Sequence, residues 1–515
     1  MPDVETYITM VGAGHRRRFG QYFTPPAVAS FMRNWVLASG IPSLYDPAFG
    51  LGAFLPDKSQ SISFSASEID PRIVNYYKKD NCSEKIKLYE EDYLLSWGRM
   101  HANIVCNPPY MRFQGFKKRK LVATLYENDL KRKLPGHANT ASAFLMKSLS
   151  EMDGRGRLAY IMPFEFLGTG YGTIVKKELI KNAHLSAIIK IECEKDVFPD
   201  VTTTVCIVLY DAANKHDKVD FYSISTIDAL AVFQTAKPSS SIPVSSLKPG
   251  EKWASYFNKK RITLNRDKMV PLKHYGRFSR GIATGANEFF VLSPSRARAL
   301  GLLESDCRPC ITKSSQIRSP YFCDKNLGQM LEADEQVLLF SINGKGSPAA
   351  LEYIRFGQRQ GFHERFLTRH RTPWYKTEDR LPSPLLMGVF SRGGYKIILN
   401  EARVINLTCY HGFQPDLHGL RFLPHLFLYL FSVTGRKVAA LSMRTYGDSL
   451  DKFEPNDIND MPVPSPDFFE KIPTLDIIQN IDNVKTNGRI NCELEHIFSS
   501  EIGLSLTNSN IPTQS

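Results

Sequence analysis

The sequence lacks long hydrophobic runs, has few cysteines and contains fewer acidic than basic residues. No apolar stretch in the 515 residues approaches the ~18 that a membrane-spanning helix needs, so no membrane partner is expected. The first residues are acidic and lack the apolar segment of a secretion signal. The nine cysteines are scattered and odd in number, which is typical of a protein of the reducing cytoplasm.

A metal site is not expected from the cysteines. Cys307 and Cys310 form the only close pair, and no second pair or spaced histidine pair accompanies them. A lone C-x-x-C is weak evidence for zinc. We therefore predict free thiols at these positions and no metal ion.

The charge balance favours a polyanionic partner. Lys and Arg number 65 against 52 Asp and Glu, which gives a net charge of +13, although many basic proteins bind no polyanion. The apolar content of 43% and charged content of 23% are those of a soluble globular protein. A chain of this length has room for two or three domains, each with its own core.

One short stretch, I-V-C-N-P-P-Y at Ile104 to Tyr110, combines a buried strand with a rigid loop. Pro108 and Pro109 prevent the strand from continuing as a helix or an inner strand. Asn107 offers a carbonyl acceptor, and Pro108 has a backbone carbonyl but no N–H. Two neighbouring acceptors suit an exocyclic amino group, and Tyr110 offers an aromatic face for a planar ring. The alternative is a proline-rich turn that merely ends a core strand.

Two turns precede that stretch. Q-Y-F-T-P-P at Gln21 to Pro26 is typical of a helix start that Thr24 can cap, and apolar residues then recur at helical spacing. D-P-A-F-G-L-G at Asp46 to Gly52 is typical of the first strand-to-helix turn of a doubly wound sheet, where Gly50 lets the backbone approach a ligand. The acid before this turn disfavours a phosphate and suits a cationic group such as an amino-acid ammonium.

Acidic residues follow the next two predicted strands. The strand at residues 63–68 ends in Glu68, about 20 residues after the glycine turn, where doubly wound folds place a carboxylate on ribose hydroxyls. Asp70 is a second candidate for that role. Asp92 follows a third short strand, so these acids and N-P-P-Y occur in the order of successive strand ends.

In these residues the chain resembles the N6-adenine DNA methyltransferases of the gamma arrangement, the modification enzymes of restriction–modification systems. That family has a T-P-P helix start, D-P-A-x-G-x-G, an E-I-D strand end, an acidic loop and N-P-P-Y, and all five occur here in that order over residues 16–110. Phe49 stands where the family often has cysteine. The resemblance implies an α/β fold: a Rossmann-like sheet, mostly parallel with an antiparallel closing strand, followed by a separate mixed α+β target-recognition domain.

The resemblance also implies roles for individual residues. A cofactor, S-adenosylmethionine, would be bound by Tyr22, Thr24, Asp46, Gly50, Glu68 and Asp92. The target adenine would be held by Asn107, Pro108 and Tyr110. Phe198, in a V-F-P loop, would pack against the extruded base, and a buried core aromatic is the alternative.

The implied function is site-specific N6-methylation of adenine in double-stranded DNA by a type II modification enzyme. Such an enzyme protects its site from a separate cognate restriction endonuclease in the bacterial cytoplasm. Because the motifs begin near residue 16, no N-terminal cleavage domain is expected, and the protein would act as a monomer or weak dimer. Two alternatives stay open: an N-P-P-Y methyltransferase that acts on RNA or on a protein glutamine, and a DNA-binding protein with a decayed cofactor fold.

The second half of the chain is predicted to recognise DNA. Residues 237–243 have linker composition, which predicts a catalytic domain over 1–240 and a target-recognition domain over 241–515. Basic residues concentrate after the boundary, and we expect DNA contacts from Lys259, Lys260 and Arg261. Interleaved aromatic residues are typical of a nucleic-acid surface, namely Tyr256, Phe257, Tyr275 and Phe278.

Overall fold

The computed structural model describes residues 4–57, 60–79, 86–111, 118–131, 139–193, 204–257, 262–263, 266–342, 344–391, 394–440, 444–446, 450–502 and 505–506. The chain divides into two compact units, one over 1–261 with 446–448 and one over 262–445 with 449–515. Four residues expected to bind the substrate lie outside the described residues: Phe198, Lys259, Lys260 and Arg261.

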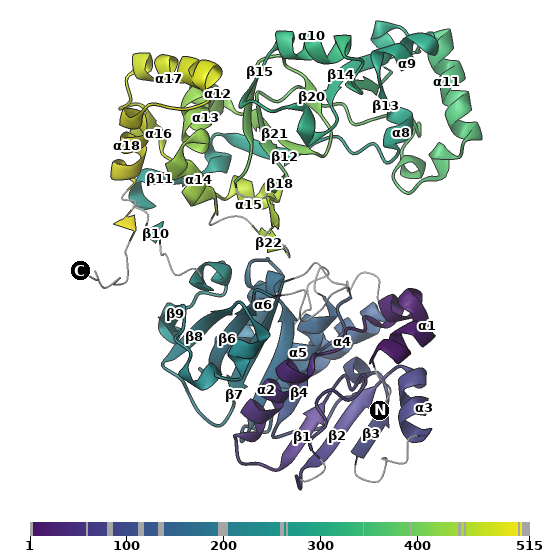
Figure 1. Ribbon diagram of the computed structural model, residues 1–515, viewed down its shortest axis with the longest axis vertical. Helices are drawn as coiled ribbons and strands as arrows, with labels where there is room; N and C mark the ends of the chain where they lie inside the picture. Colours follow the sequence, from purple (N-terminus) through teal and green to yellow (C-terminus); the bar gives the residue numbers. More distant parts are fainter. Residues whose placement is uncertain are drawn as a thin grey trace. The chain divides into compact units, whose positions relative to one another are not determined.

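The first unit is built on a sheet whose described part has nine strands in the order β3-β2-β1-β4-β5-β7-β6-β8-β9 (Figure 1). Within it, β7 runs antiparallel to both neighbours, β9 runs antiparallel to β8, and the other pairs are parallel. The predicted Rossmann-like, mostly parallel sheet is confirmed. The strands are β1 (Ser43–Asp46), β2 (Ser63–Glu68), β3 (Ile86–Glu90), β4 (Ile104–Cys106), β5 (Arg157–Pro163), β6 (Leu185–Ile191), β7 (Val205–Asp211), β8 (Lys218–Ile224) and β9 (Ser240–Pro243).

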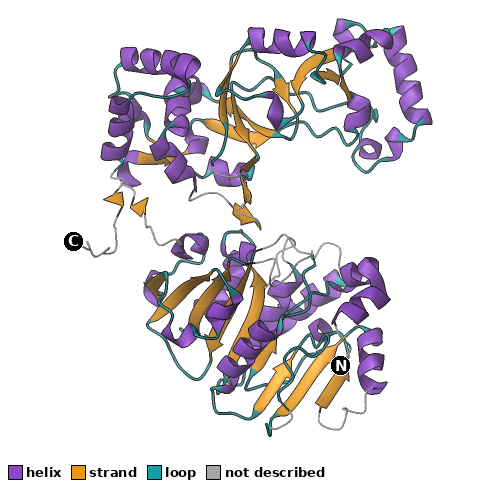
Figure 2. Cartoon of the chain, viewed as in Figure 1, coloured by secondary structure: helices purple, strands orange, loops and turns teal. Residues whose placement is uncertain are grey.

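Helices cover both faces of this sheet (Figure 2). Successive strand residues point to opposite faces, so in β4 Ile104 and Cys106 join the core under α4, α5 and α6, whereas Val105 joins the core under α2 and α3. The helices of this unit are α1 (Val4–Phe19), which breaks at Gly12, α2 (Pro26–Leu37), α3 (Pro71–Lys79), α4 (Arg119–Leu130), α5 (Thr140–Ser150) and α6 (Gly172–Ile180). The helix predicted after Thr24 is confirmed.

The strand order reverses between β1 and β4, which lie side by side through the pair Tyr45 and Ile104. In open α/β sheets, ligands bind outside the carboxyl ends of the strands at such a reversal. Asp46 ends β1 and Asn107 follows β4, so the two motifs predicted to carry the chemistry meet at this point.

The expected boundary near residue 240 is wrong by about twenty residues, because the first unit extends to residue 261. The stretch with linker composition forms β9, whose residues 240–243 pair with β8. Trp253 and Phe257 then bury their side chains in the first unit's core. Serine and proline suit an edge strand as well as a linker, which explains the difference.

The second unit has mixed α+β architecture, as predicted. Its two largest sheets among the described residues have five strands in the order β12-β21-β17-β19-β15 and four strands in the order β13-β16-β14-β20. These strands are β12 (Gly276–Arg280), β21 (Tyr410–Pro415), β17 (Leu385–Gly388), β19 (Ile397–Asn400), β15 (Tyr321–Phe322), β13 (Val291–Leu292), β16 (Leu338–Phe340), β14 (Cys307–Ile311) and β20 (Ile405–Asn406). Its helices are α8 (Asn287–Phe290), α9 (Pro294–Ala299), α10 (Asp324–Glu332), α11 (Pro348–Arg359), α12 (Leu417–Arg421), α13 (Leu423–Phe431), α14 (Val433–Ala440), α15 (Pro455–Asn459), α16 (Pro466–Phe469), α17 (Thr474–Asn487) and α18 (Cys492–Glu501).

The aromatic residues expected on a nucleic-acid surface are mostly in the cores. Tyr275 and Phe278 are fully buried in the second unit, and Phe257 is buried in the first. A buried ring stabilises packing and offers no face to a base, so this expectation is wrong for these three. Among the described residues, no helix is long and apolar enough to cross a membrane.

The structure makes the importance of the 240–257 segment testable. Trp253 is fully buried, and its Nε1 donates a hydrogen bond to the Lys248 carbonyl at 3.0 Å. Trp253→Ala should lower the free energy of unfolding of the first unit by about 3–5 kcal/mol, the usual cost of an aromatic-to-alanine change in a core. Urea unfolding followed by circular dichroism measures this loss.

The control is Val232→Ala at a side chain that is 62% exposed, which should change stability by less than about 0.5 kcal/mol. Equal stabilities of the two variants would contradict the assignment of this segment to the first unit.

Candidate active site

A cavity of about 780 Å³ opens in the first unit at the carboxyl ends of β1, β2, β3 and β4. Most of the predicted catalytic and cofactor residues line it, namely Tyr22, Gly50, Glu68, Asp92, Asn107 and Tyr110. Thr24 and Asp46 are hydrogen-bonded to residues of this lining: Thr24 accepts from Asn107, and Asp46 accepts from Ala48. Pro108 is buried beside Asn107. The structure therefore brings together residues that span 88 positions from 22 to 110.

The side-chain amide of Asn107 is held in one orientation. Its Nδ2 donates hydrogen bonds to the Tyr22 carbonyl at 2.8 Å and to the Thr24 hydroxyl at 3.0 Å. Both N–H groups are thereby used, and a flipped amide would place its oxygen against the Tyr22 carbonyl, which can only accept. The Asn107 Oδ1 is buried and has no hydrogen-bond partner among the described residues.

This role of Thr24 differs from the predicted helix cap. The N-cap of α2 is Pro25, Pro26 occupies the first helical position, and no side chain caps the helix. The Thr24 hydroxyl accepts the Asn107 hydrogen bond instead. The proline pair starts the helix without a cap because an N-terminal proline removes an N–H that would otherwise lack a partner.

The loop after Asn107 is clamped by the first residue of α5. The Thr140 hydroxyl donates to the Pro109 carbonyl and accepts from the Met111 amide at 3.0 Å, while the Thr140 amide donates to the Met111 carbonyl at 3.0 Å. Gly20 lies against the other side of this loop, where an added Cβ would stand 3.1 Å from the Tyr110 amide nitrogen. The loop backbone is therefore held from both sides.

Two tyrosine rings form an aromatic wall of the cavity. The rings of Tyr22 and Tyr110 lie 5.8 Å apart at an interplanar angle of 33°. Burial raises the pKa of the Tyr110 hydroxyl well above its ordinary value, so this side chain is neutral. A neutral ring wall suits a planar, uncharged group.

The acid of the glycine turn is buried and only half satisfied. Asp46 is fully buried, its Oδ1 accepts a hydrogen bond from the Ala48 amide at 3.0 Å, and its Oδ2 has no partner among the described residues. Burial raises the pKa of Asp46 to about 8. A buried carboxylate lacking a partner favours a cationic group, which would restore the ionised form.

Glu68 holds the glycine turn that contains Gly50. Its Oε2 accepts from the Gly50 amide at 2.9 Å and its Oε1 accepts from the Asp70 amide at 2.7 Å. Gly50 has a φ of 54°, which a side chain would strain. Burial raises the pKa of Glu68 to about 7. Each carboxylate oxygen retains a second lone pair for a ligand hydroxyl.

Asp70 is a structural residue and does not line the cavity. Its carboxylate accepts hydrogen bonds from the Tyr7 hydroxyl at 3.0 Å, from the Gln21 amide at 2.6 Å and from the Arg72 backbone at 3.0 Å, and His15 lies 2.6 Å away. Burial opposes ionisation, but these donors hold the pKa of Asp70 below its ordinary value. Asp70 thus ties both parts of α1 to β2, and Glu68 is the acid that faces the cavity.

Asp92 is positioned by a local turn. Its Oδ1 accepts from the Leu94 amide at 3.3 Å, and its Oδ2 lies 3.4 Å from the Lys118 ammonium. The neighbouring Glu91 also lines the cavity and accepts hydrogen bonds from Ser67 at 2.7 Å and from Arg99. Burial opposes ionisation of Glu91, but the Arg99 guanidinium holds its pKa below the ordinary value.

The sequence interpretation missed part of the cavity lining. Ile69 follows Glu68, is 43% exposed and lines the cavity, and its position between two acids is the signal that could have found it. Tyr93 and Phe144 come from the 3₁₀ turn after Asp92 and from α5. Nothing in the sequence marks Phe144 as a cavity residue, because a single aromatic residue in a helix is usually part of the core.

Phe49, which departs from the resembled family, belongs to the core. Its ring packs edge-on against Tyr77 at 5.2 Å and against Phe64 at 6.3 Å, and it is only 3% exposed. Pro47, Ala48 and Gly50 line the cavity around it. The substitution therefore fills space beneath α3 and takes no part in the lining.

Comparisons with known proteins match both halves of the chain. The family model of the Eco57I restriction-modification methylase matches residues 56–198, and that of the type II methyltransferase M.Eco57I C-terminal domain matches residues 250–498. Type II methyltransferase M.AccI of Acinetobacter calcoaceticus is 34% identical over 469 residues, which cover 88% of this chain and 86% of that protein. M.XamI of Xanthomonas campestris pv. amaranthicola is 23% identical over 88% of this chain and 86% of its own.

A solved structure shares the fold. The type IIL restriction–modification enzyme MmeI, solved in complex with DNA, matches 97% of this chain and 78% of its own at a TM-score of 0.63 and 13% identity. The sheet and its strand-end cavity thus define a Rossmann-like domain that is followed by a separate second domain. The chain belongs to the type II methyltransferase family of restriction–modification systems, since its similarity to M.AccI extends over nearly the whole chain. The expected family is confirmed at this level.

The raised pKa values make stability depend on pH. Asp46 has an ordinary pKa of 3.8 and a folded pKa of about 8, so between these values the folded state binds more protons than the unfolded state. The free energy of unfolding should therefore fall as pH rises through this window, by at most about 1.4 kcal/mol per pH unit for one carboxyl. Asp46→Asn should flatten the slope in urea unfolding between pH 5 and pH 8, a range chosen inside this window.

The control is Asp57→Asn, at a side chain that is 68% exposed. It should leave the slope unchanged. A steeper slope in Asp46→Asn than in the unmodified protein would contradict the assignment.

Proposed function

We propose that this methyltransferase transfers a methyl group from S-adenosylmethionine to the N6 amino group of adenine in double-stranded DNA. The observation that carries the proposal is the Asn107 amide, whose two N–H groups are occupied and whose buried oxygen has no partner among the described residues. A buried oxygen of this kind costs folding free energy unless a ligand satisfies it. An exocyclic amino group is the matching donor.

The residues of the cavity fit the cofactor. The unpartnered Asp46 Oδ2 suits a cationic amino-acid end, the Gly50 turn allows close backbone approach, and Glu68 has lone pairs for ribose hydroxyls. Tyr22 and Asp92 complete the set of proposed contacts, and Ile69 adds an apolar surface for a purine. When bound, S-adenosylmethionine supplies a methyl group from its sulfonium centre.

The chain's own residues would activate the amino group by accepting hydrogen bonds from its two N–H groups. The nitrogen lone pair of an aromatic amine is delocalised into the ring, which makes it a poor nucleophile. Hydrogen bonds to the Asn107 Oδ1 and the Pro108 carbonyl would favour tetrahedral geometry at this nitrogen. Positive charge grows on the nitrogen in the transition state, and these fixed acceptor dipoles stabilise that charge.

The target base must leave the DNA stack to reach this point, at a cost of a few kcal/mol. Stacking of the base on Tyr110, which has Tyr22 beside it, would offset part of that cost. Such stacking contributes roughly 1–3 kcal/mol for one base. Thr140 and Gly20 would keep the N-P-P-Y loop rigid while the base enters. Phe198, outside the described residues, stays a proposed contact of the extruded base.

We assign recognition of the DNA sequence to the second unit, which starts at residue 262. Lys259, Lys260 and Arg261 stay proposed contacts to the phosphate backbone, where they would position the duplex without reading its sequence. The protein would act as a monomer or weak dimer and protect its site from a separate restriction endonuclease.

The substrate is tested by incubating the full-length protein with methyl-labelled S-adenosylmethionine and duplex DNA, tRNA or ribosomal protein. Label should enter duplex DNA alone, and digestion to nucleosides should recover it as N6-methyladenine. Label only in RNA or protein would favour the alternative substrates and refute the DNA assignment. Label recovered as N4-methylcytosine would refute the adenine assignment, because cytosine presents the same pair of donors.

The role of Asn107 is tested by Asn107→Ala. Loss of the acceptor should lower the rate of methyl transfer by roughly 100- to 1,000-fold, by analogy with the loss of one preorganised dipole in other enzymes. Binding of S-adenosylmethionine, measured by calorimetry, should remain. Transfer at the unmodified rate would refute the catalytic assignment.

Thr24 supplies a matched pair of controls for the amide orientation. Thr24→Ser keeps the hydroxyl acceptor and should retain the rate, whereas Thr24→Val removes it at nearly constant volume. Thr24→Val should lower the rate by roughly tenfold, the equivalent of one net hydrogen bond. Equal rates for the two variants would show that Thr24 does not orient Asn107.

A further inference from the structure

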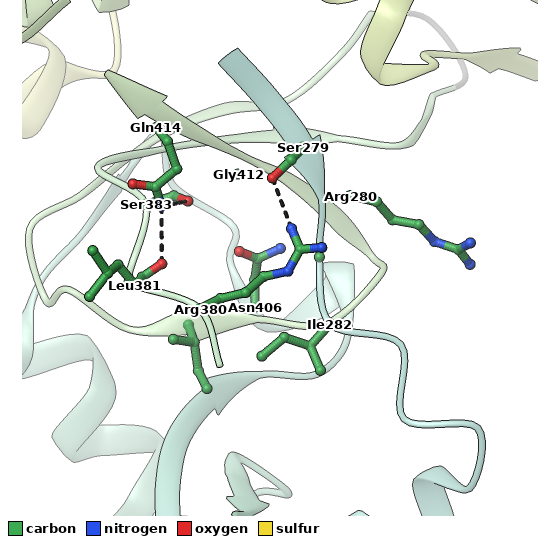
Figure 3. A pocket seen from close by; sticks show the side chains of 11 residues that line it. Ser279, Arg280, Ile282, Arg380, Leu381, Ser383, Asn406, Gly412 and Gln414 are labelled. Carbon is green, nitrogen blue, oxygen red and sulfur yellow. Dashed lines mark hydrogen bonds between the residues drawn. The ribbon is translucent and has the colours of Figure 1, made fainter. Parts of the chain in front are cut away.

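The second unit contains a pocket of its own, about 270 Å³ in volume, beside the paired strands β12 and β21 (Figure 3). This volume is below the roughly 300–1,000 Å³ of pockets that enclose whole small ligands. It suits one edge of a flat group that enters from outside. The polar side chains that line it come from separate parts of the chain: Ser279, Arg380, Ser383, Asn406 and Gln414.

The guanidinium of Arg380 is held in place with donors to spare. Its Nε donates to Glu378 at 2.7 Å, one terminal nitrogen lies 2.5 Å from the same carboxylate, and the other donates to the Ser279 hydroxyl at 2.9 Å. An arginine has five N–H donors, so two remain for a ligand. Figure 3 shows Arg380 reaching across to Ser279, whereas Arg280 points away. Arg380 is still 35% exposed and is therefore accessible.

The backbone that carries Arg380 is also held. Arg308 donates to the Arg380 carbonyl at 2.9 Å and to Asp379 at 3.2 Å. The guanidinium therefore has its orientation set by Glu378 and Ser279 and its position set by Arg308. Such preorganisation lowers the entropy lost when a ligand binds.

Two amide side chains present only acceptors to the pocket. The Asn406 Nδ2 donates to the carbonyls of Leu407 at 3.0 Å and Tyr410 at 2.7 Å. The Gln414 Nε2 donates to the Leu381 carbonyl at 3.0 Å and the Ser383 hydroxyl at 2.9 Å. Because both N–H groups of each amide are occupied, each can meet a ligand only with its carbonyl oxygen.

Two glycines create the space beside these amides. A Cβ at Gly281 would stand 2.4 Å from the Asn406 Nδ2, and a Cβ at Gly412 would stand 2.3 Å from the Ser383 hydroxyl oxygen. The contacts at both positions therefore depend on the absence of a side chain. Glycine at these two positions therefore lets the polar atoms of the pocket lie close together.

We propose that this pocket reads a G·C base pair in the major groove of the DNA target, with Arg380 as the specificity-determining residue. An arginine fork matches the guanine O6 and N7 acceptors, and an amide carbonyl matches the cytosine N4 donor. The pocket offers this combination of two free guanidinium donors beside carbonyl acceptors from Gln414 and Asn406. This inference rests on the proposed function, because it requires duplex DNA as the substrate.

The acceptors separate this reading from a phosphate contact. A phosphate would meet two carbonyl oxygens as well as the guanidinium, and oxygen atoms of like partial charge repel it. A base pair presents both donors and acceptors along one edge and can satisfy all of these groups. The mixed set therefore favours a base edge over the backbone.

The test uses the full-length protein, S-adenosylmethionine and a library of duplexes randomised around the target. Methylated molecules are sequenced to give the preferred sequence of the unmodified protein and of Arg380→Ala and Arg380→Lys. Both variants should lose the preference for G·C at one position by roughly tenfold to a hundredfold and keep the other positions. Arg380→Lys retains the charge and loses only the fork.

The control is Arg355→Ala, at an exposed arginine that pairs with Glu352 on α11. It should leave the preferred sequence unchanged. A duplex with 7-deazaguanine at the affected position should slow the unmodified protein by a similar factor and leave Arg380→Ala unaffected, because the N7 acceptor is already unused.

The outcomes distinguish this inference from the proposed function. If the unmodified protein methylates no duplex, the proposed function fails. If it methylates a defined sequence and both Arg380 variants, shown by thermal melting to be folded, keep that sequence, the base-reading inference alone is overturned. A uniform loss on all sequences with a salt dependence reduced by about one phosphate would also overturn it. If Arg380→Ala unfolds, Arg380→Lys and the 7-deazaguanine duplex decide the result.

Discussion

The active site depends on one constraint, the orientation of the Asn107 amide. An amide can present either a donor or an acceptor to the cavity, and only the acceptor suits the proposed amino group. The Tyr22 carbonyl and the Thr24 hydroxyl make that choice by occupying both N–H groups. The segment before α2 thus orients a side chain more than eighty residues away in sequence. Thr140 and Gly20 hold the same loop from its other sides.

The acidic residues around the cavity differ in how many hydrogen bonds their carboxylate oxygens accept. Asp70 is saturated by donors from α1, whereas Asp46 keeps one buried oxygen without a partner among the described residues. A saturated carboxylate stabilises the fold, and an unsatisfied one lowers stability until a ligand arrives. This contrast explains why two acids on neighbouring strand ends have pKa values displaced in opposite directions.

In the second unit too, hydrogen bonds orient the polar side chains of a pocket. Glu378 and Ser279 orient Arg380, while backbone carbonyls and the Ser383 hydroxyl accept the amide N–H groups of Asn406 and Gln414. In both units, hydrogen bonds on one edge of a side chain fix which atoms its opposite edge presents. Three of the four aromatic residues that looked suited to nucleic acid, Phe257, Tyr275 and Phe278, lie instead in the cores, where close packing holds them.

The sequence by itself determined the mostly parallel sheet, the order of its strand ends and six residues of the cavity lining, because short apolar strands and turn residues are local signals. It also identified Asn107, Asp46 and Glu68 as residues of one site. Only the tertiary structure decided that Thr24 orients Asn107 and caps nothing, that Asp70 is structural, and that residues 240–257 complete the first unit. The pocket at Arg380 had no sequence signal, since its residues come from four separate segments that only folding brings together. Local patterns encode local structure, whereas hydrogen-bond partners distant in sequence are settled by packing.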